Sequence, residues 1–101
     1  MIYRHGDLIL KEVPHFTTGV ETKTNVHVLA EGELTGHRHV LSSSIPITVI
    51  NTSRHQWVAL DAPAKLTHEE HKALIISPGI YQIMKEREYD YVNTQTSKRL
   101  D

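Results

Sequence analysis

Cysteine is absent from the 101-residue sequence, and its absence excludes disulfide bonds, zinc–thiolate sites, iron–sulfur clusters and thiol nucleophiles. Any metal ion bound by this chain must therefore be held by nitrogen and oxygen atoms. A charge excess is absent too, because 11 Lys and Arg residues are balanced by 12 Asp and Glu residues, for a formal net charge of -1. No overall electrostatic field therefore attracts nucleic acid or an anionic membrane.

Long apolar runs are also missing. The N-terminal segment MIYRHGDLIL reaches a charged residue at Arg4, so it fits neither a secretory signal nor a membrane span. We therefore expect a cytoplasmic protein without a membrane partner. The chain length suits one domain and is too short for two, so we expect a single domain over residues 1–101, with 92–101 as a flexible polar tail.

Short apolar segments rich in Val and Ile, separated by turn-forming residues, follow one another along the chain. This pattern is typical of an all-β domain. Turn signals recur about every ten residues, which favours a small β-barrel or sandwich of about eight short strands. The expected strands lie at 7–13, 26–32, 36–41, 45–50, 56–60, 64–68, 72–77 and 79–92, with a polar loop at 15–25 and a break at the serine triplet 42–44.

The segment 61–77 allows two interpretations. Asp61 as N-cap, Pro63 in the first turn and a Pro-Gly stop after Ser77 would suit a helix. The apolar stripe of that helix would include a glutamate, however, and the β-branched end of KALIIS suits a strand. We therefore favour a β-hairpin over a helix.

Histidine is abundant, with eight residues in the chain. Four of them form two pairs, His37 and His39 in TGHRHVL, and His68 and His71 in THEEHKAL. On a strand, side chains two positions apart point the same way, so His37 and His39 share a face with Leu41. The remaining four are scattered singly, and we expect them to be surface or locally hydrogen-bonded residues. They are His5, His15, His27 and His55.

Both pairs together supply the donors of one metal site. Two imidazoles on one strand face can tilt inward to share an ion, and a turn through Glu69-Glu70 brings His71 beside His68. Gly36 leaves room for the backbone to bend or for a ligand to approach. The predicted metal ligands are His37, His39, His68 and His71.

The GHRH segment, with His37 and His39, resembles the first half of the metal-binding pattern of the cupin superfamily. Cupins are small jelly-roll barrels in which such a pair, a nearby glutamate and a histidine from a later strand hold one divalent metal. The resemblance implies a cupin-like jelly roll. The chain also resembles small uncharacterised bacterial and phage proteins with a GHxH, HEEH and EREYD pattern.

The sequence departs from the cupin pattern in two respects. No glutamate follows the first pair within VLSSSIP, and His68 and His71 precede the Pro78-Gly79 turn instead of following it. Either Glu69 or Glu70 would have to replace the missing carboxylate.

Two to four imidazoles with at most one carboxylate suit Zn, Fe(II), Mn, Ni or Cu(II). If three side chains bind, the open position lets the ion activate water or O2 or polarise a substrate oxygen, with Glu69 or Glu70 as general base. If all four histidines bind, the site closes and the ion is structural. We predict a small metal-dependent enzyme, such as a hydrolase, isomerase or oxygenase, or a metal-bound protein that binds a small-molecule ligand.

A non-enzymatic β-barrel module, with a structural metal or none, is the competing prediction. On a strand, Lys85, Arg87, Tyr89 and Tyr91 would share one face, either as a surface for protein or single-stranded nucleic acid or as an ordinary solvent-facing row. An exposed edge strand in so small a barrel also predicts a homodimer.

Overall fold

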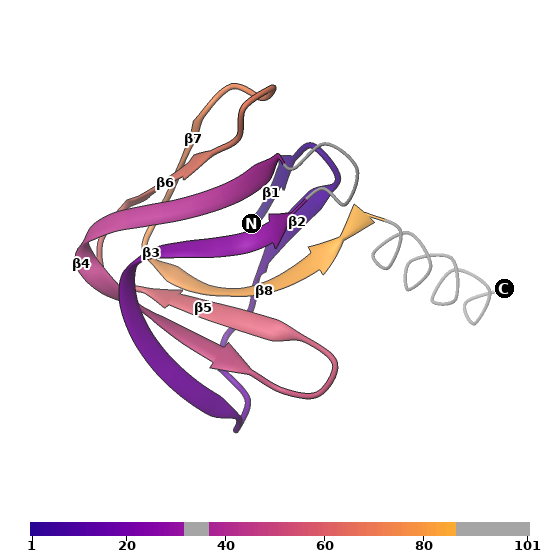
Figure 1. The fold of residues 1–101 in the computed structure, drawn as a ribbon. Helices are drawn as coiled ribbons and strands as arrows, with labels where there is room; N and C mark the ends of the chain where they lie inside the picture. Colours follow the sequence, from indigo (N-terminus) through magenta and orange to yellow (C-terminus); the bar gives the residue numbers. More distant parts are fainter. Residues whose placement is uncertain (32–36, 87–101) are drawn as a thin grey trace, which may run out of the picture.

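The computed structural model describes residues 1–31 and 37–86, and within them the protein is all-β. Figure 1 shows the strands wrapped into a nearly closed, barrel-like sheet. No helix among the described residues is long and apolar enough to cross a bilayer. The strands are β1 (Ile2–His5), β2 (Leu8–Glu12), β3 (Val20–Glu31), β4 (Arg38–Asn51), β5 (Gln56–Leu60), β6 (Ala64–Thr67), β7 (Leu74–Ile76) and β8 (Gly79–Lys85).

All strand pairs are antiparallel, and the sheet follows the order β1-β2-β8-β5-β4-β6-β7. The long strand β4 organises it. Along one edge β4 pairs with β3, and along the other it pairs with β6 at residues 40–42 and with β5 at residues 48–51. The two ends of β4 therefore carry different parts of the sheet, which curl around a shared interior.

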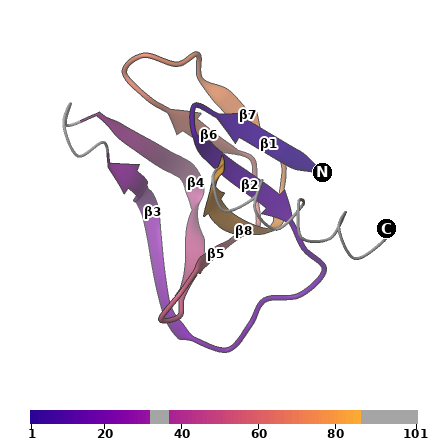
Figure 2. The same ribbon diagram turned by 90° about the vertical axis from the view of Figure 1, so that its right-hand side faces the viewer.

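The ends of this path, β1 and β7, approach each other and nearly close the barrel (Figure 2). Tyr3 of β1 makes the contact, because its hydroxyl donates to Ser77 Oγ and accepts from the Ser77 backbone N–H, both at 3.2 Å. The hydroxyl of buried Tyr81 donates to the Ser77 carbonyl at 2.7 Å. Side chains, rather than a backbone ladder, join β1 to β7 in the described part of the chain.

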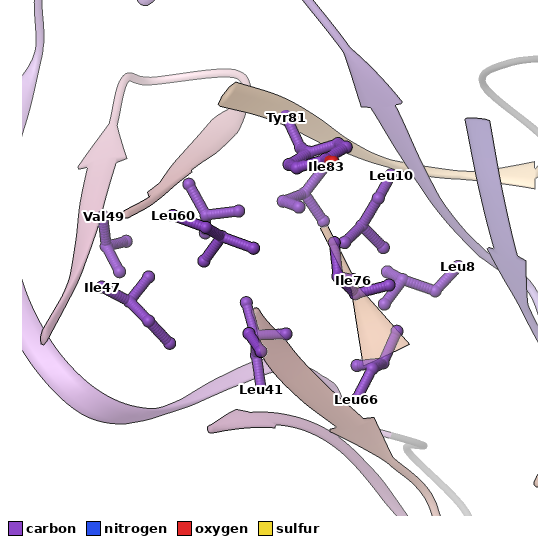
Figure 3. Packing of buried hydrophobic residues seen from close by; sticks show 12 residues of the cluster. Leu8, Leu10, Leu41, Ile47, Val49, Leu60, Leu66, Ile76, Tyr81 and Ile83 are labelled. Atoms are coloured by element: carbon purple, nitrogen blue, oxygen red, sulfur yellow. The ribbon is translucent and has the colours of Figure 1, made fainter. Parts of the chain in front are cut away.

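The core occupies the interior of this barrel (Figure 3). Its members recur two positions apart on each strand, which is the alternation of side chains on a strand that is buried on one face. They include Leu8 and Leu10 of β2, Leu41, Ile47 and Val49 of β4, Val58 and Leu60 of β5, Ala64 and Leu66 of β6, Ile76 of β7, and Tyr81 and Ile83 of β8.

The prediction of two strands at 36–41 and 45–50 is wrong, because β4 runs through the serine triplet without a break. Ser43 to Pro46 lie between the two parts of the β3–β4 ladder, where the register shifts. The Asn25 side chain donates to the Ser43 carbonyl there, at 3.0 Å. Pro46 lacks a backbone donor, and at this unpaired position the sheet loses no hydrogen bond.

The predicted loop at 15–25 is also wrong in part, since β3 begins at Val20. In addition, the N-terminal strand β1 was not among the expected segments. The number of strands nevertheless agrees with the expected eight, because the additional strand β1 offsets the fusion within β4.

The hairpin interpretation of 61–77 is confirmed and the helix is wrong. Strands β6 and β7 pair antiparallel, with Ala64 opposite Ile76 and Leu66 opposite Leu74. Ala64, Leu66 and Ile76 are buried in the core, and only a strand places such positions on one side. Residues 68–73 form the connection between β6 and β7.

Candidate metal centre

Histidines continue the inward-facing rows of the core toward one end of the barrel. On β4, His39 stands two positions before Leu41, and the two side chains are 5% and 0% exposed. On the other segment, half-buried His68 follows Leu66 by two positions. Pairing of Leu41 with Leu66 places the two rows side by side, so the rings of His39 and His68 lie 4.4 Å apart between centroids.

His5 is the residue that the sequence analysis assigned wrongly. It is 3% exposed, at the end of β1, and belongs to the same group of rings. Its Nδ1 lies 3.0 Å from His39 Nδ1, and its Nε2 lies 2.9 Å from the Lys72 carbonyl oxygen. These partners are distant in sequence, so His5 is neither a surface residue nor a locally hydrogen-bonded one.

Four imidazoles thus form a compact group, which we call the histidine cluster: His5, His39, His68 and His71. All six distances between ring centroids are short. They are 5.1 Å for His5–His39, 6.2 Å for His5–His68, 5.6 Å for His5–His71, 4.4 Å for His39–His68, 6.2 Å for His39–His71 and 4.5 Å for His68–His71.

His37 lies at the rim of this cluster, with its ring 5.5 Å from that of His68. Its Nδ1 contacts Glu70 Oε1 at 3.2 Å. The neighbouring Glu69 is held by a backbone group, since its Oε2 accepts a hydrogen bond of 3.0 Å from the Arg38 backbone N–H. His37, His68 and Glu69 each offer a ligand atom, and these atoms lie within 4.8 Å of one another.

Three histidines have a ring nitrogen next to an oxygen. His5 Nε2 faces the Lys72 carbonyl at 2.9 Å, and His37 Nδ1 faces Glu70. His39 Nε2 lies 3.6 Å from Asp7 Oδ1, an ion-pair distance rather than a hydrogen bond. Histidines that bind metals usually donate their second ring N–H to such an oxygen, which fixes the tautomer and aims the other nitrogen at the ion.

His68 has the opposite arrangement, because its Nδ1 accepts a hydrogen bond of 3.1 Å from the Glu70 backbone N–H. In the neutral ring the proton is therefore on Nε2. For His68 to bind an ion, either this hydrogen bond must break or the ring must turn over. Since His68 begins the connection between β6 and β7, it has more freedom to do so than the strand residue His39.

The turn between β1 and β2 fits against the cluster only because residue 6 is glycine. Gly6 has a φ of 64°, and a Cβ added there would lie 2.6 Å from His71 Nε2 and 3.3 Å from His39 Cε1. Positive φ at this first central position, followed by Asp7 without it, is the pattern of a type II′ hairpin turn. The His5-Gly6-Asp7 segment thus places the His5 ring, the Gly6 backbone and the Asp7 carboxylate next to the histidine cluster.

The sequence from residue 4 to residue 86 matches the family model described as Domain of unknown function (DUF8820). The chain belongs to this family. The matching model is not that of a cupin family, so the resemblance to cupins stays a prediction. No curated protein and no solved structure matches the chain.

The environment of His5 and His39 favours neutral imidazoles. Burial, reinforced by the neighbouring His68 and His5, lowers the pKa of His39 to about 4, although Asp7 opposes this effect. Burial also lowers the pKa of His5, against the effect of the Lys72 carbonyl. Neutral imidazole is the form that offers a lone pair to a metal ion.

At Glu69 the shift goes the other way. The hydrogen bond from the Arg38 backbone N–H lowers the pKa of this carboxyl, with help from His37 and His68. Glu69 is therefore an anion suited to binding a cation, and a weaker general base than an ordinary glutamate.

The other sequence-predicted features fall away from the site or outside the described residues. His15 is exposed, His27 Nε2 contacts Gln56 Oε1 at 3.1 Å, and His55 packs its ring against Trp57. Lys85 ends β8 and is exposed. The features outside the described residues are Gly36, Arg87, Tyr89, Tyr91 and the tail 92–101.

One sequence signal bears on the missed residue His5. Gly6-Asp7 is a two-residue turn signal between apolar segments, and it would have placed β1 beside β2. Pairing of His5 with Leu8 then follows from the register of a two-residue hairpin. That His5 faces the cluster depends on the closure of the barrel between β1 and β7, which no local pattern encodes.

Proposed function

We propose that this protein binds a divalent transition metal ion in the histidine cluster and uses the ion in a reaction or in binding a small-molecule ligand. His5, His39 and His71 are the proposed ligands, with His68 as a fourth that its loop can bring in or withdraw. The observation that carries the proposal is the spacing of the four rings.

That spacing agrees with the dimensions of a metal–imidazole site. With metal–nitrogen distances near 2.1 Å, ring centroids lie about 3.2 Å from the ion and about 5 Å from one another in a tetrahedral arrangement. The observed separations, from 4.4 to 6.2 Å, lie on both sides of this value. Side chains gathered only by apolar packing have no reason to bring four polar rings to this distance, since burying polar groups is costly.

Proton positions at His5 and His39 supply a second argument. The contact with the Lys72 carbonyl requires a proton on His5 Nε2, so His5 Nδ1 presents a lone pair to His39 Nδ1 at 3.0 Å. Without an ion, His39 must donate from Nδ1, which leaves its Nε2 lone pair facing the Asp7 carboxylate.

A bound cation removes this conflict. His39 then carries its proton on Nε2, facing Asp7, and both Nδ1 atoms direct lone pairs toward the ion. Two neighbouring nitrogen ligands of one ion lie about 3.0 Å apart in octahedral geometry and about 3.4 Å apart in tetrahedral geometry, given metal–nitrogen distances near 2.1 Å, and the Nδ1 atoms are 3.0 Å apart. The donor set of imidazole nitrogens favours Zn, Fe(II), Mn or Ni over ions that prefer oxygen alone.

An ion with three histidine ligands keeps a position for water, O2 or a substrate oxygen, and the bound water ionises more readily than bulk water. Glu70 is the better candidate for proton transfer, since Glu69 is committed to the Arg38 backbone. Hydrolase, isomerase and oxygenase chemistry all remain compatible with such a site, because the fold does not choose among them.

The test is metal binding by the protein purified without a histidine tag. We expect elemental analysis to find near-stoichiometric metal, and calorimetric titration with Zn²⁺ to show affinity that falls at least tenfold in His39→Gln. The matched control is His15→Gln, which changes an exposed histidine away from the cluster and should leave affinity unchanged. A folded protein that binds none of Zn²⁺, Mn²⁺, Fe²⁺ and Ni²⁺ would contradict the proposal.

A further inference from the structure

We infer that a second metal position lies beside the first, formed by His37, His68 and Glu69, so that the centre holds two ions. This inference rests on the proposed function, because it assigns the first ion to the histidine cluster. It gives His68 to the outer ion and leaves His5, His39 and His71 to the inner one.

The outer donors already stand at near-coordinating distances. Their ligand atoms lie within 4.8 Å of one another, whereas ligands on opposite sides of one ion are separated by up to about 4.3 Å. A contraction of a few tenths of an ångström therefore completes the set. Two of the three donors, His68 and Glu69, are adjacent residues of the connection after β6, which is the part of the site best able to make this movement.

The supporting contacts of the outer donors are also in place. Glu70 Oε1 contacts His37 Nδ1 at 3.2 Å, the kind of carboxylate contact that orients a metal-bound imidazole. The Arg38 backbone N–H holds Glu69 through Oε2 at 3.0 Å. His37 and Glu69 are therefore oriented by groups that are not themselves ligands, as is usual around metal ions, whereas His68 must give up its hydrogen bond from the Glu70 backbone N–H or turn its ring over.

The two donor sets adjoin without being the same. His68 contacts a ring of the inner set on each side, at 4.4 Å from His39 and 4.5 Å from His71. Paired ions in proteins typically lie about 3.5–4 Å apart and share a bridging water or substrate oxygen. Adjacent donor sets of this kind place two ions close enough for such a bridge.

Charge balance favours two ions over one. Three carboxylates surround the rings: Asp7 near His39, Glu70 beside His37, and Glu69 held by a backbone N–H. Within the described residues they pair with imidazole or backbone nitrogens rather than with a lysine or arginine side chain. One divalent ion leaves a charge of about -1 at the centre and two leave about +1, which attracts an anionic oxygen ligand such as hydroxide or phosphate.

Stoichiometry is the decisive measurement. We expect equilibrium dialysis against Mn²⁺, followed by elemental analysis, to give two ions per chain in the wild type. His37→Gln and Glu69→Gln should each leave one ion, and His5→Gln should also leave one. His15→Gln is the control and should keep two. Because His37 and Glu69 lie at the rim, their variants test the outer position without disturbing the buried rings of His5 and His39.

Electron paramagnetic resonance gives an independent readout. Two Mn²⁺ ions a few ångströms apart should show a spin-coupled spectrum, which should revert to that of isolated Mn²⁺ in His37→Gln. A single ion in the wild type, or a full complement of ions retained by both rim variants, would overturn the second position while leaving the first intact. Absence of any bound ion would overturn the proposed function itself.

Discussion

The two ends of the barrel interior are built on the same strands and have opposite chemistry. Leu41 and Leu66 lie in an apolar core, and two positions further along the same inward-facing rows lie His39 and His68. At the apolar end, the side chains need only fill the interior at close packing. At the histidine end each buried ring nitrogen needs a partner, and the partners around the rings are a carbonyl, a backbone N–H, two carboxylates and other rings. Strand alternation therefore fixes where a side chain points, and the partners decide what it does.

The largest expected effect comes from a substitution in the apolar end of the barrel interior. Ile47→Ala removes a fully buried side chain eight residues from His39 on β4, and we expect unfolding to become easier by about 2–5 kcal/mol. Urea unfolding in the presence of a chelator measures this loss. Metal stoichiometry of the folded variant should stay at the wild-type value, and a parallel loss of metal would mean that the two ends are not independent.

Acid should act on the histidine end. Burial lowers the pKa of His39 to about 4 from 6.5, so the folded protein resists a proton that the unfolded chain accepts near pH 6.5. The stabilisation from neutral His39 is therefore complete above pH 6.5 and is lost as the pH falls toward 4, by an amount on the order of 2 kcal/mol. The groups that face His39 contribute to its pKa: His68, His5 and His71 help to lower it, and the carboxylate of Asp7 opposes them.

The measurement is the free energy of unfolding of the metal-free protein between pH 7.5 and pH 4.5. His39→Gln should flatten the dependence, because glutamine does not titrate in this range. An identical slope in the wild type and the variant would show that His39 is not the group responsible.

The variant with the smallest expected loss of stability should have a large effect on metal affinity. Gly6→Ala places a side chain at a φ of 64°, which costs about 1 kcal/mol. The added Cβ would also collide with the His71 side chain and crowd that of His39, which would push both rings away from the turn. We expect Zn²⁺ affinity to fall at least tenfold, although residue 6 is not a ligand.

A matched control is available at the other glycine that packs closely against a strand. Gly19→Ala would bring a Cβ into collision with the Asn51 carbonyl oxygen, away from the histidines. It should destabilise the protein and leave Zn²⁺ affinity unchanged. Equal losses of affinity in the two variants would mean that the site responds to stability alone.

The sequence predicted the fold class well because its pattern is local. Alternation of apolar residues placed the strand at 56–60 at its observed bounds, and it favoured the hairpin at 64–76 over a helix. Local patterns also produced the main error in the fold. Serine and proline at 43–46 indicate a turn, whereas these residues continue β4 where it has no ladder partner.

The site was predictable to a smaller extent for the same reason. The two-residue spacing of His37 and His39, and the three-residue spacing of His68 and His71, are local relations that the sequence displays. His5 joins them only because β1 returns to the β6–β7 connection, a contact between residues 5 and 72. A single histidine in an N-terminal segment carries no sign of such a partner.

The histidine cluster lies across the gap between β1 and β7, so an ion bound there would affect how the barrel is held closed. His5 stands on the first strand of the sheet path, and His68 and His71 stand on the connection that leads into the last one. Coordination across this gap would hold β1 and the β6–β7 connection together and close a loop of more than sixty residues. In a chain that has no thiols, shared imidazole ligands would act as a reversible crosslink, which chelation or acid would release.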